Sequence, residues 1–158
     1  MPLFECGIYC KHWIEVALEC LPETVWAEWH DKLAFLSTDV RDAVRLTRKT
    51  RENYEIIFLS ERIIPVGPLS EAHPDVRYFE FCVLHEVAHA INDDLPPDEI
   101  STEQTQLQEE RANRLAFDWF NSYLAQRAHT GLRLFTVEEL QAAQAKTQAA
   151  MNALNKLN

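Results

Sequence analysis

The sequence predicts an α+β fold built as a single domain over residues 1–158. The first observation is size, since 158 residues with 47% apolar side chains can bury one hydrophobic core but not two. The second is a β-rich region between residues 43 and 64, and the third is a pair of long helical stretches that follow it. Strands and helices are therefore expected to pack around one common core.

The first part of the chain is expected to hold a cysteine-containing segment, about residues 1–21, followed by a helix. Pro22 stands where proline favours the start of a helix. The apolar residues that follow it at helical spacing are Val25, Trp26, Trp29 and Leu33. These residues predict a helix over 23–36 with the tryptophans in the core.

The middle of the chain predicts short strands. Residues 43–47 alternate between apolar and polar, residues 54–59 are rich in β-branched and aromatic side chains, and a polar turn at 49–53 separates them. Ile63 and Ile64, which precede Pro65, suggest a third short strand. The run 65–74 contains proline and glycine and is expected to be a loop.

The next helix carries the most informative feature, His85-Glu86-Val87-Ala88-His89, an H-E-x-x-H pattern. Residues 78–91 are apolar on most of their surface, which predicts a buried helix. On a helix, two residues four apart lie on one face, so both imidazoles can reach one metal ion. Because buried histidines and glutamates need polar partners, a metal ion is favoured over histidines that bind nothing.

This pattern suits a catalytic zinc ion. Two neutral imidazoles bind Zn²⁺ without cancelling its charge, a third ligand leaves one position open, and the pKa of a bound water falls to about 7. Glu86 lies one step round the helix and can take the proton from that water. We therefore assign His85 and His89 as ligands of one Zn²⁺ per chain and Glu86 as the general base.

The third ligand is expected on a later helix that covers about residues 100–128. The residues 92–98 break the preceding helix and form a loop. Glu109 and Asn113 are four apart on the later helix, so we assign Glu109 as the third ligand and Asn113 as an acceptor that orients one histidine. Glu110, which points about 100° away, is the alternative ligand. Glu109 and Glu110 could instead lie on a solvated face of the helix and bind no metal. The buried side of this helix is expected to consist of Leu107, Leu115, Phe117, Trp119, Phe120 and Leu124.

The pattern H-E-x-x-H followed by E-x-x-A-N-x-x-A resembles the ImmA/IrrE family of zinc metallopeptidases and, more broadly, the gluzincins. The resemblance covers residues 78–120 and departs from the family at Ala88, where glycine is common, and at Leu115, where phenylalanine is frequent. It implies a zincin-like fold, with a small antiparallel sheet beside the cleft. It also implies an endopeptidase that cleaves a helix-turn-helix repressor and so derepresses stress, mobile-element or phage-defence genes. A weaker resemblance links the chain to CapP-like regulators of CBASS anti-phage operons.

Composition limits the other function classes. The net charge of −10 and the pI of about 5.0 argue against broad binding to nucleic acid or membrane surfaces. No stretch approaches the length of a membrane span, and a signal peptide is not evident, so a cytoplasmic protein is expected. The residues 136–158 are rich in alanine and glutamine and predict a terminal helix that packs on the domain or binds a partner.

The four cysteines leave three interpretations open. Cys6, Cys10 and Cys20 lie near the start, and Cys82 shares the histidine face of the metal helix. They could be buried small apolar residues, or they could contribute to a second metal site. One of the four could also be an inhibitory thiol that reaches the zinc and displaces its water.

A basic segment, Arg41 to Arg51, runs against the acidic average. The segment could be a solvated hairpin. It could instead contact single-stranded DNA through Arg45, Arg48 and Lys49, with the DNA as activator. Two alternatives to a peptidase follow: a catalytically silent zinc-binding regulator, and a nucleic-acid sensor with structural zinc. Tyr123 and His129 are the candidates for a second oxyanion donor, and His73 is a candidate for lining the cleft.

Overall fold

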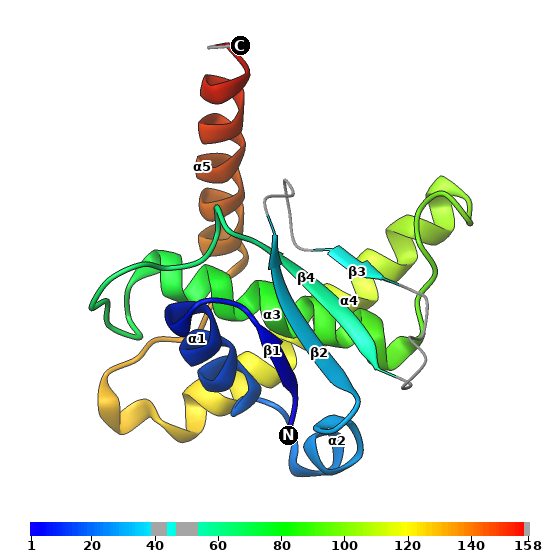
Figure 1. Ribbon diagram of the computed structural model, residues 1–158. Helices are drawn as coiled ribbons and strands as arrows, with labels where there is room; N and C mark the ends of the chain where they lie inside the picture. Colours follow the sequence, from blue (N-terminus) through cyan, green and yellow to red (C-terminus); the bar gives the residue numbers. More distant parts are fainter. Residues whose placement is uncertain (39–43, 47–53, 157–158) are drawn as a thin grey trace.

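The computed structural model describes residues 1–38, 44–46 and 54–156, with backbone only at 44–46 and 155. Within these ranges the fold is α+β, as the sequence predicts, with a sheet and helices around one apolar core (Figure 1). The strands are β1 (Leu3–Glu5), β2 (Leu33–Thr38), β3 (Val44–Leu46) and β4 (Glu55–Ser60). The α-helices are α1 (Ile8–Leu18), α2 (Glu23–Trp29), α3 (Pro74–Asn92), α4 (Thr102–Gln126) and α5 (Val137–Asn155), with a 3-10 helix at Ala128–Thr130.

The sheet has the strand order β1-β2-β4-β3 and is mixed. β2 pairs in parallel with β1 and β4, and only the edge strand β3 pairs antiparallel, with Arg45 opposite Ile57. The prediction of an antiparallel sheet is therefore wrong except at this edge. The reason is connectivity: α1 and α2 carry the chain back between β1 and β2, and β3 runs back between β2 and β4, so β1, β2 and β4 point the same way.

Two local predictions in the first half are wrong. The predicted helix 23–36 ends at Trp29, and its last residues belong to β2, where Leu33 and Phe35 are fully buried. Alternate residues of a strand face the same side, so the core-facing pair Leu33 and Phe35 has the period of two that a helix lacks. The short strand predicted at Ile63 and Ile64 does not form. Ile63 is buried but lies in a turn after β4, where its N–H donates a hydrogen bond to Ser60 O at 3.1 Å.

The helix that carries the H-E-x-x-H residues is buried, as predicted. α3 begins with Pro74 after the N-cap His73, whose Nδ1 accepts a hydrogen bond from Asp75 N at 3.2 Å. It ends at Asp93, whose positive φ of 53° closes the helix in the left-handed conformation. Twelve of its residues are buried, and α3 packs against α1, α4 and the sheet.

α4 runs beside α3 and begins with a capping box formed by Ser101 and Gln104. Its buried residues are Ala112, Ala116, Trp119, Phe120 and Leu124. Leu107, expected on the buried side, is 59% exposed, because the first turns of α4 extend beyond the core. No helix in the described residues has the length and hydropathy needed to cross a bilayer.

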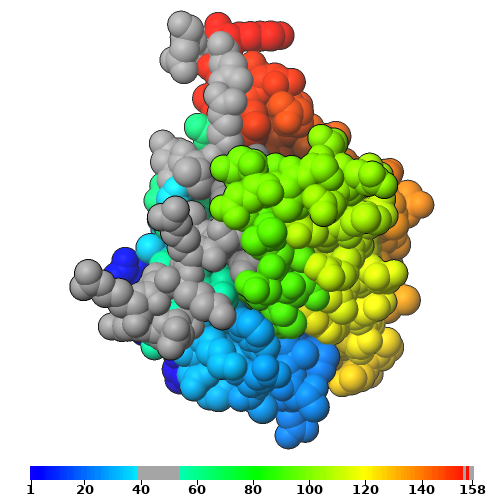
Figure 2. All heavy atoms as spheres, turned by 90° about the vertical axis from the view of Figure 1, so that its right-hand side faces the viewer, coloured from blue at the N-terminus to red at the C-terminus, as the bar shows by residue number. Residues whose placement is uncertain are grey.

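α5 leaves the body of the protein at an angle, with its first turns beside α3 and its last turns projecting (Figures 1 and 2). Its base is fixed by Arg77 of α3, which is 5% exposed and binds both carboxylate oxygens of Glu139, at 2.5 and 3.1 Å. The Arg77 guanidinium also lies over the Phe120 and Phe135 rings, 5.7 and 5.5 Å from their centroids. The first turn of α5 is therefore held at one place on α3.

Candidate metal centre

His85, His89 and Glu109 come together as a cluster that could hold a metal ion, with one ligand atom from each lying within 4.8 Å of the others. The two histidines lie one turn apart on α3, and the carboxylate comes from the neighbouring helix α4. His89 is buried and His85 is half-buried, whereas the Glu109 side chain is 49% exposed. The cluster is therefore more open to solvent on the α4 side, at Glu109, than on the α3 side.

The spacing of the three donors fits a small tetrahedral cation. The two Nε2 atoms are 3.0 Å apart, and each lies 3.3 Å from an oxygen of Glu109. Ligand atoms bound at the usual zinc distances lie about 3.3–3.5 Å apart in a tetrahedral site. Because two imidazoles and one carboxylate also match the donor types zinc uses in catalytic sites, the residues fit this ion.

Glu86 lies next to the cluster. Its side chain is 7% exposed, and it lines a cavity of about 300 Å³ together with His85 and Glu109. A carboxylate in this position can act on a molecule held in the cavity, and burial strengthens its electrostatic interactions. We call this space the metal cavity. Its other lining residues are Ile63, Tyr78, Phe81, Cys82, Asn113, Leu140 and Gln144.

Asp94 contacts the cluster, and the sequence interpretation missed it. It is 4% exposed, and its Oδ2 lies 2.8 Å from His89 Nδ1, while its Oδ1 accepts a hydrogen bond from Arg111 of α4. The left-handed residue Asp93 turns the chain back, and Asp94 N bonds to His89 O at 3.1 Å. The carboxylate therefore accepts a hydrogen bond from His89 Nδ1–H, which holds the proton on Nδ1 and leaves Nε2 to face the cluster. A carboxylate directly after the helix end was the only signal.

The contact with a histidine of the cluster that was expected of Asn113 is made by Asp94. Asn113 lines the cavity, but His89 Nδ1 is already bonded to Asp94, and the buried His85 Nδ1 has no hydrogen-bond partner among the described residues. The alternative ligand Glu110 points away and accepts a hydrogen bond from Gln106 at 3.0 Å. The geometry thus selects Glu109 over Glu110 as the third member of the cluster.

The charges of the cluster favour a cation. Hydrogen bonds with His85 and then His89 hold the pKa of Glu109 well below its ordinary value, so the carboxylate is ionised. Burial acts to lower the pKa of His89, yet its hydrogen bonds to Glu109 and Asp94 raise that pKa overall. Three carboxylates, those of Glu86, Asp94 and Glu109, therefore surround two imidazoles, an arrangement that attracts positive charge.

Comparisons with protein-family models, curated proteins and solved structures were made for the whole chain. None of them matches it. The case for the site thus depends on its residues and their geometry.

The cysteines differ in their relation to the cavity. None forms a disulfide, and of the four only Cys82 lines the metal cavity. Burial raises the pKa of the Cys6, Cys10 and Cys20 thiols, with Cys6 and Cys10 hydrogen-bonded to each other. Because the thiolate is the metal ligand, raised pKa values favour the interpretation of these three as packed apolar residues. Since Cys82 is the cysteine that lines this cavity, it is the one placed to act as the inhibitory thiol, a role that stays a hypothesis.

Other predicted site residues lie elsewhere. Tyr123 donates to Glu19 Oε2 at 3.0 Å and His129 is exposed in the 3-10 helix; neither lines the metal cavity, so neither is placed as an oxyanion donor. Arg45 is on β3, whose side chains the structure leaves undescribed, and Arg48 and Lys49 lie outside the described residues together with the predicted turn 49–53. The DNA-contact hypothesis therefore stays a prediction.

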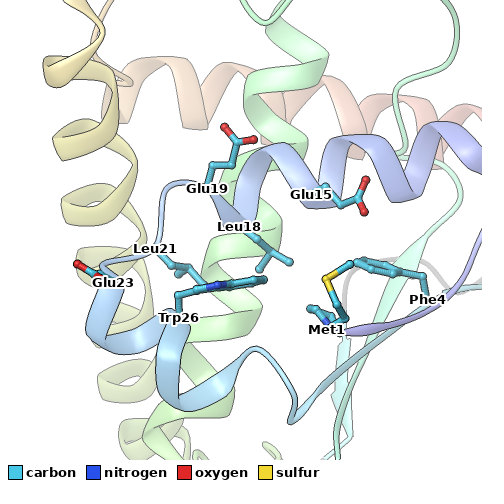
Figure 3. A pocket seen from close by; sticks show the side chains of 9 residues that line it. Met1, Phe4, Glu15, Leu18, Glu19, Leu21, Glu23 and Trp26 are labelled. Atoms are coloured by element: carbon cyan, nitrogen blue, oxygen red, sulfur yellow. The ribbon is translucent and has the colours of Figure 1, made fainter.

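A larger hollow, of about 660 Å³, lies between β1, α1 and α2 (Figure 3). Leu18, Leu21 and Trp26 form one side and Met1 and Phe4 the other, with glutamates at the edge. It contains none of the cluster residues. Cavity size alone would therefore not identify the cluster, since His85, Glu86 and Glu109 line the smaller cavity.

Proposed function

We propose that this protein is a zinc-dependent endopeptidase that hydrolyses a peptide bond in a protein substrate. The observation that carries the proposal is the presence of the buried carboxylate of Glu86 in the same cavity as His85 and Glu109. A structural metal site is usually closed by four protein ligands, whereas this cluster brings three donors together and opens into a cavity. Three ligands beside a carboxylate are the arrangement that metal-assisted hydrolysis needs.

The residues have distinct roles in this proposal. His85, His89 and Glu109 would hold the ion, which when bound supplies Lewis acidity that lowers the pKa of a water molecule and polarises the peptide carbonyl. Glu86 takes the proton from the attacking water and passes it to the leaving amine. Tyr78 and Gln144 line the same cavity and carry groups that can donate hydrogen bonds to a developing oxyanion, in place of Tyr123 and His129.

The substrate proposed is a helix-turn-helix repressor. This part depends on the resemblance of the H-E-x-x-H and E-x-x-A-N-x-x-A patterns to the ImmA/IrrE peptidases, and the zincin-like fold and regulatory role are proposed on the same ground. The small cavity, about 300 Å³, supports a restricted substrate over general digestion because it has room for little more than the reacting peptide.

The decisive test is Glu86→Gln, compared with wild type for zinc content and for cleavage. The substitution keeps the shape of the side chain and removes its basicity. We expect one zinc per chain by elemental analysis in both proteins, and cleavage slower by about 10²–10⁴-fold in the variant. The substrates to test are helix-turn-helix repressors and a peptide library, with the products analysed by mass spectrometry. The exposed Glu110→Gln serves as the matched control and should cleave like wild type.

The same experiment separates the alternatives. A Glu86→Gln protein that still relieves repression would favour a catalytically silent regulator. A loss of function on changing Arg45 or Arg48, with Glu86→Gln unaffected, would favour the DNA sensor with structural zinc. Wild-type protein that takes up no zinc would refute all three.

A further inference from the structure

A second hollow adjoins the metal cavity along α5. It measures about 580 Å³, against about 300 Å³ for the metal cavity, and Ile63 and Tyr78 line both. The two spaces are therefore neighbours that share these side chains as a boundary. α5 forms a wall of each, with Leu140 and Gln144 at the metal cavity and residues 143–154 along the second hollow, which we call the α5 groove.

The lining of the α5 groove is mainly apolar. The α5 side presents one helical face, made of Ala143, Lys146, Thr147, Ala150, Met151 and Leu154. The facing wall is the segment after β4, including Ile64, Pro65, Val66 and Leu69. Val66 is 72% exposed and Leu154 is 46% exposed, so apolar surface is left open to solvent on both walls.

Three charged side chains line the groove. Lys146 Nζ lies 2.6 Å from Asp75 Oδ1, whereas Arg62 adds a further positive charge on the facing wall. His73, which also lines the groove, uses its Nδ1 to cap α3. Apolar residues outnumber these charged residues in the lining, so the groove suits leucine-like or aromatic side chains.

The length of the groove suits an extended peptide. The α5 residues from 143 to 154 span about 16 Å at 1.5 Å per residue, a distance that about five residues of extended chain would cover at 3.3 Å each. Alternate side chains of such a peptide would face the apolar lining. One end of the path is at Glu86 and His85, where the peptide bond would be cut.

We propose that the α5 groove binds the substrate polypeptide on one side of the scissile bond, as an extended segment with apolar side chains. This inference depends on the proposed peptidase function, because it is the metal cavity that makes the groove a substrate path. α5 and the segment after β4 are thus specificity-determining parts of the site.

The test uses hydroxamates, which chelate an open zinc site and need no catalysis. Acetohydroxamate is the minimal probe, and two further series attach three leucines or three glutamates to either side of the chelating group. Affinities for the zinc-loaded full chain are measured by calorimetry. We expect the leucine compounds in one orientation to bind about 10–100-fold more tightly than acetohydroxamate, and the glutamate compounds not to do so.

Two neighbouring alanines provide the matched variants. Ala150 lines the groove, whereas Ala149 is exposed on α5 and lines neither hollow. Ala150→Glu should remove the gain from leucine and leave acetohydroxamate binding unchanged, and Ala149→Glu should keep both.

The outcomes distinguish the two proposals. If acetohydroxamate binds but leucine adds nothing, or if Ala150→Glu keeps the full gain, the groove is not the substrate path and the metal site stands. If acetohydroxamate does not bind to zinc-loaded protein, the open metal site is refuted and the groove proposal is refuted with it.

Discussion

Asp94 shows how one side chain can set the protonation state of a candidate metal ligand, His89. Its carboxylate is almost fully buried, lies 2.8 Å from His89 Nδ1 and is also bonded to Arg111. A neutral imidazole carries one proton, and a carboxylate on Nδ1 keeps that proton there. The lone pair of Nε2 is then directed at the cluster, where a cation would bind.

We therefore expect Asp94→Asn to weaken zinc binding about 10–100-fold, since an amide stabilises this tautomer less well than a carboxylate does. Competition with a chromophoric chelator measures the change. The adjacent Asp93→Asn is the control, because asparagine tolerates the left-handed conformation that Asp93 adopts at a φ of 53°. Equal affinities for the two variants would show that Asp94 does not orient the ligand.

Glu80 is the clearest pH-sensitive residue away from the cluster. It is 3% exposed on α3, and its Oε1 has no hydrogen-bond partner among the described residues. Burial, and then the charge of Glu71, raise the pKa of its carboxyl from 4.5 to about 8. The folded protein therefore holds a proton at pH 7 that the unfolded chain has lost.

The sign of the resulting pH dependence follows from linkage. Between pH 4.5 and 8 the folded state binds more protons than the unfolded state at this residue, so the free energy of unfolding falls as the pH rises. Glu80→Gln removes the titration. Its stability relative to wild type should increase by on the order of a few kcal/mol between pH 5 and pH 9.

Urea unfolding at the two pH values measures this difference. Glu28→Gln, on the exposed side of α2, is the control and should follow the pH profile of wild type. A Glu80→Gln profile parallel to wild type would mean that Glu80 is ionised in the folded protein.

At the residue scale, local spacing was sufficient for some members of the site and insufficient for others. His85, Glu86 and His89 were predictable because their geometry depends on one helix alone. Glu109 could be inferred from its position on a second helix, although the choice over Glu110 needed the packing of α4 on α3. Asp94 depends on a left-handed turn in the loop, and a sequence carries little signal for that.

At the element scale, α5 connects the fold to the site. Arg77 binds both carboxylate oxygens of Glu139, and the Arg77 side chain is 6% exposed. Leu140, which follows Glu139 in α5, is buried and lines the metal cavity. Removing the carboxylate would leave a buried guanidinium without its partner charge, which is far more costly than the loss of an exposed pair.

Glu139→Gln should accordingly lower the free energy of unfolding by about 3 kcal/mol. The measurement is urea denaturation, with Glu138→Gln as the control, since Glu138 is exposed in the same helical turn. Equal stabilities of the two variants would show that Arg77 is satisfied without Glu139, by Arg133 O and the aromatic rings.

The elements differ in how far the sequence predicted them. α3, α4 and α5 are long and periodic, and their predicted positions agree with the structure to within a few residues. β2 was assigned to a helix because Leu33 follows Val25, Trp26 and Trp29 at helical spacing, whereas sheet formation uses the period of two in Leu33 and Phe35. The parallel pairing was not predictable, because it follows from long-range connectivity.

At the scale of the whole molecule, the cluster joins two helices that no disulfide links. Its histidines are on α3 and its carboxylate is on α4, and the protein carries a net charge of −10. A divalent cation would offset the carboxylates of Glu86, Asp94 and Glu109 in one small volume. Because the unfolded chain lacks this arrangement, metal binding should add directly to the stability of the folded state.

The expected gain can be calculated. With free zinc at 1,000 times its dissociation constant, the free energy of unfolding rises by about 4 kcal/mol over the metal-free protein. Thermal unfolding with and without a chelator measures the shift. Glu109→Ala should lose most of it because one of three ligands is missing, and Glu110→Ala, which leaves all three in place, should retain it. If zinc raised the melting temperature of both variants equally, it would be bound elsewhere, and the α3–α4 cluster would not be the metal centre.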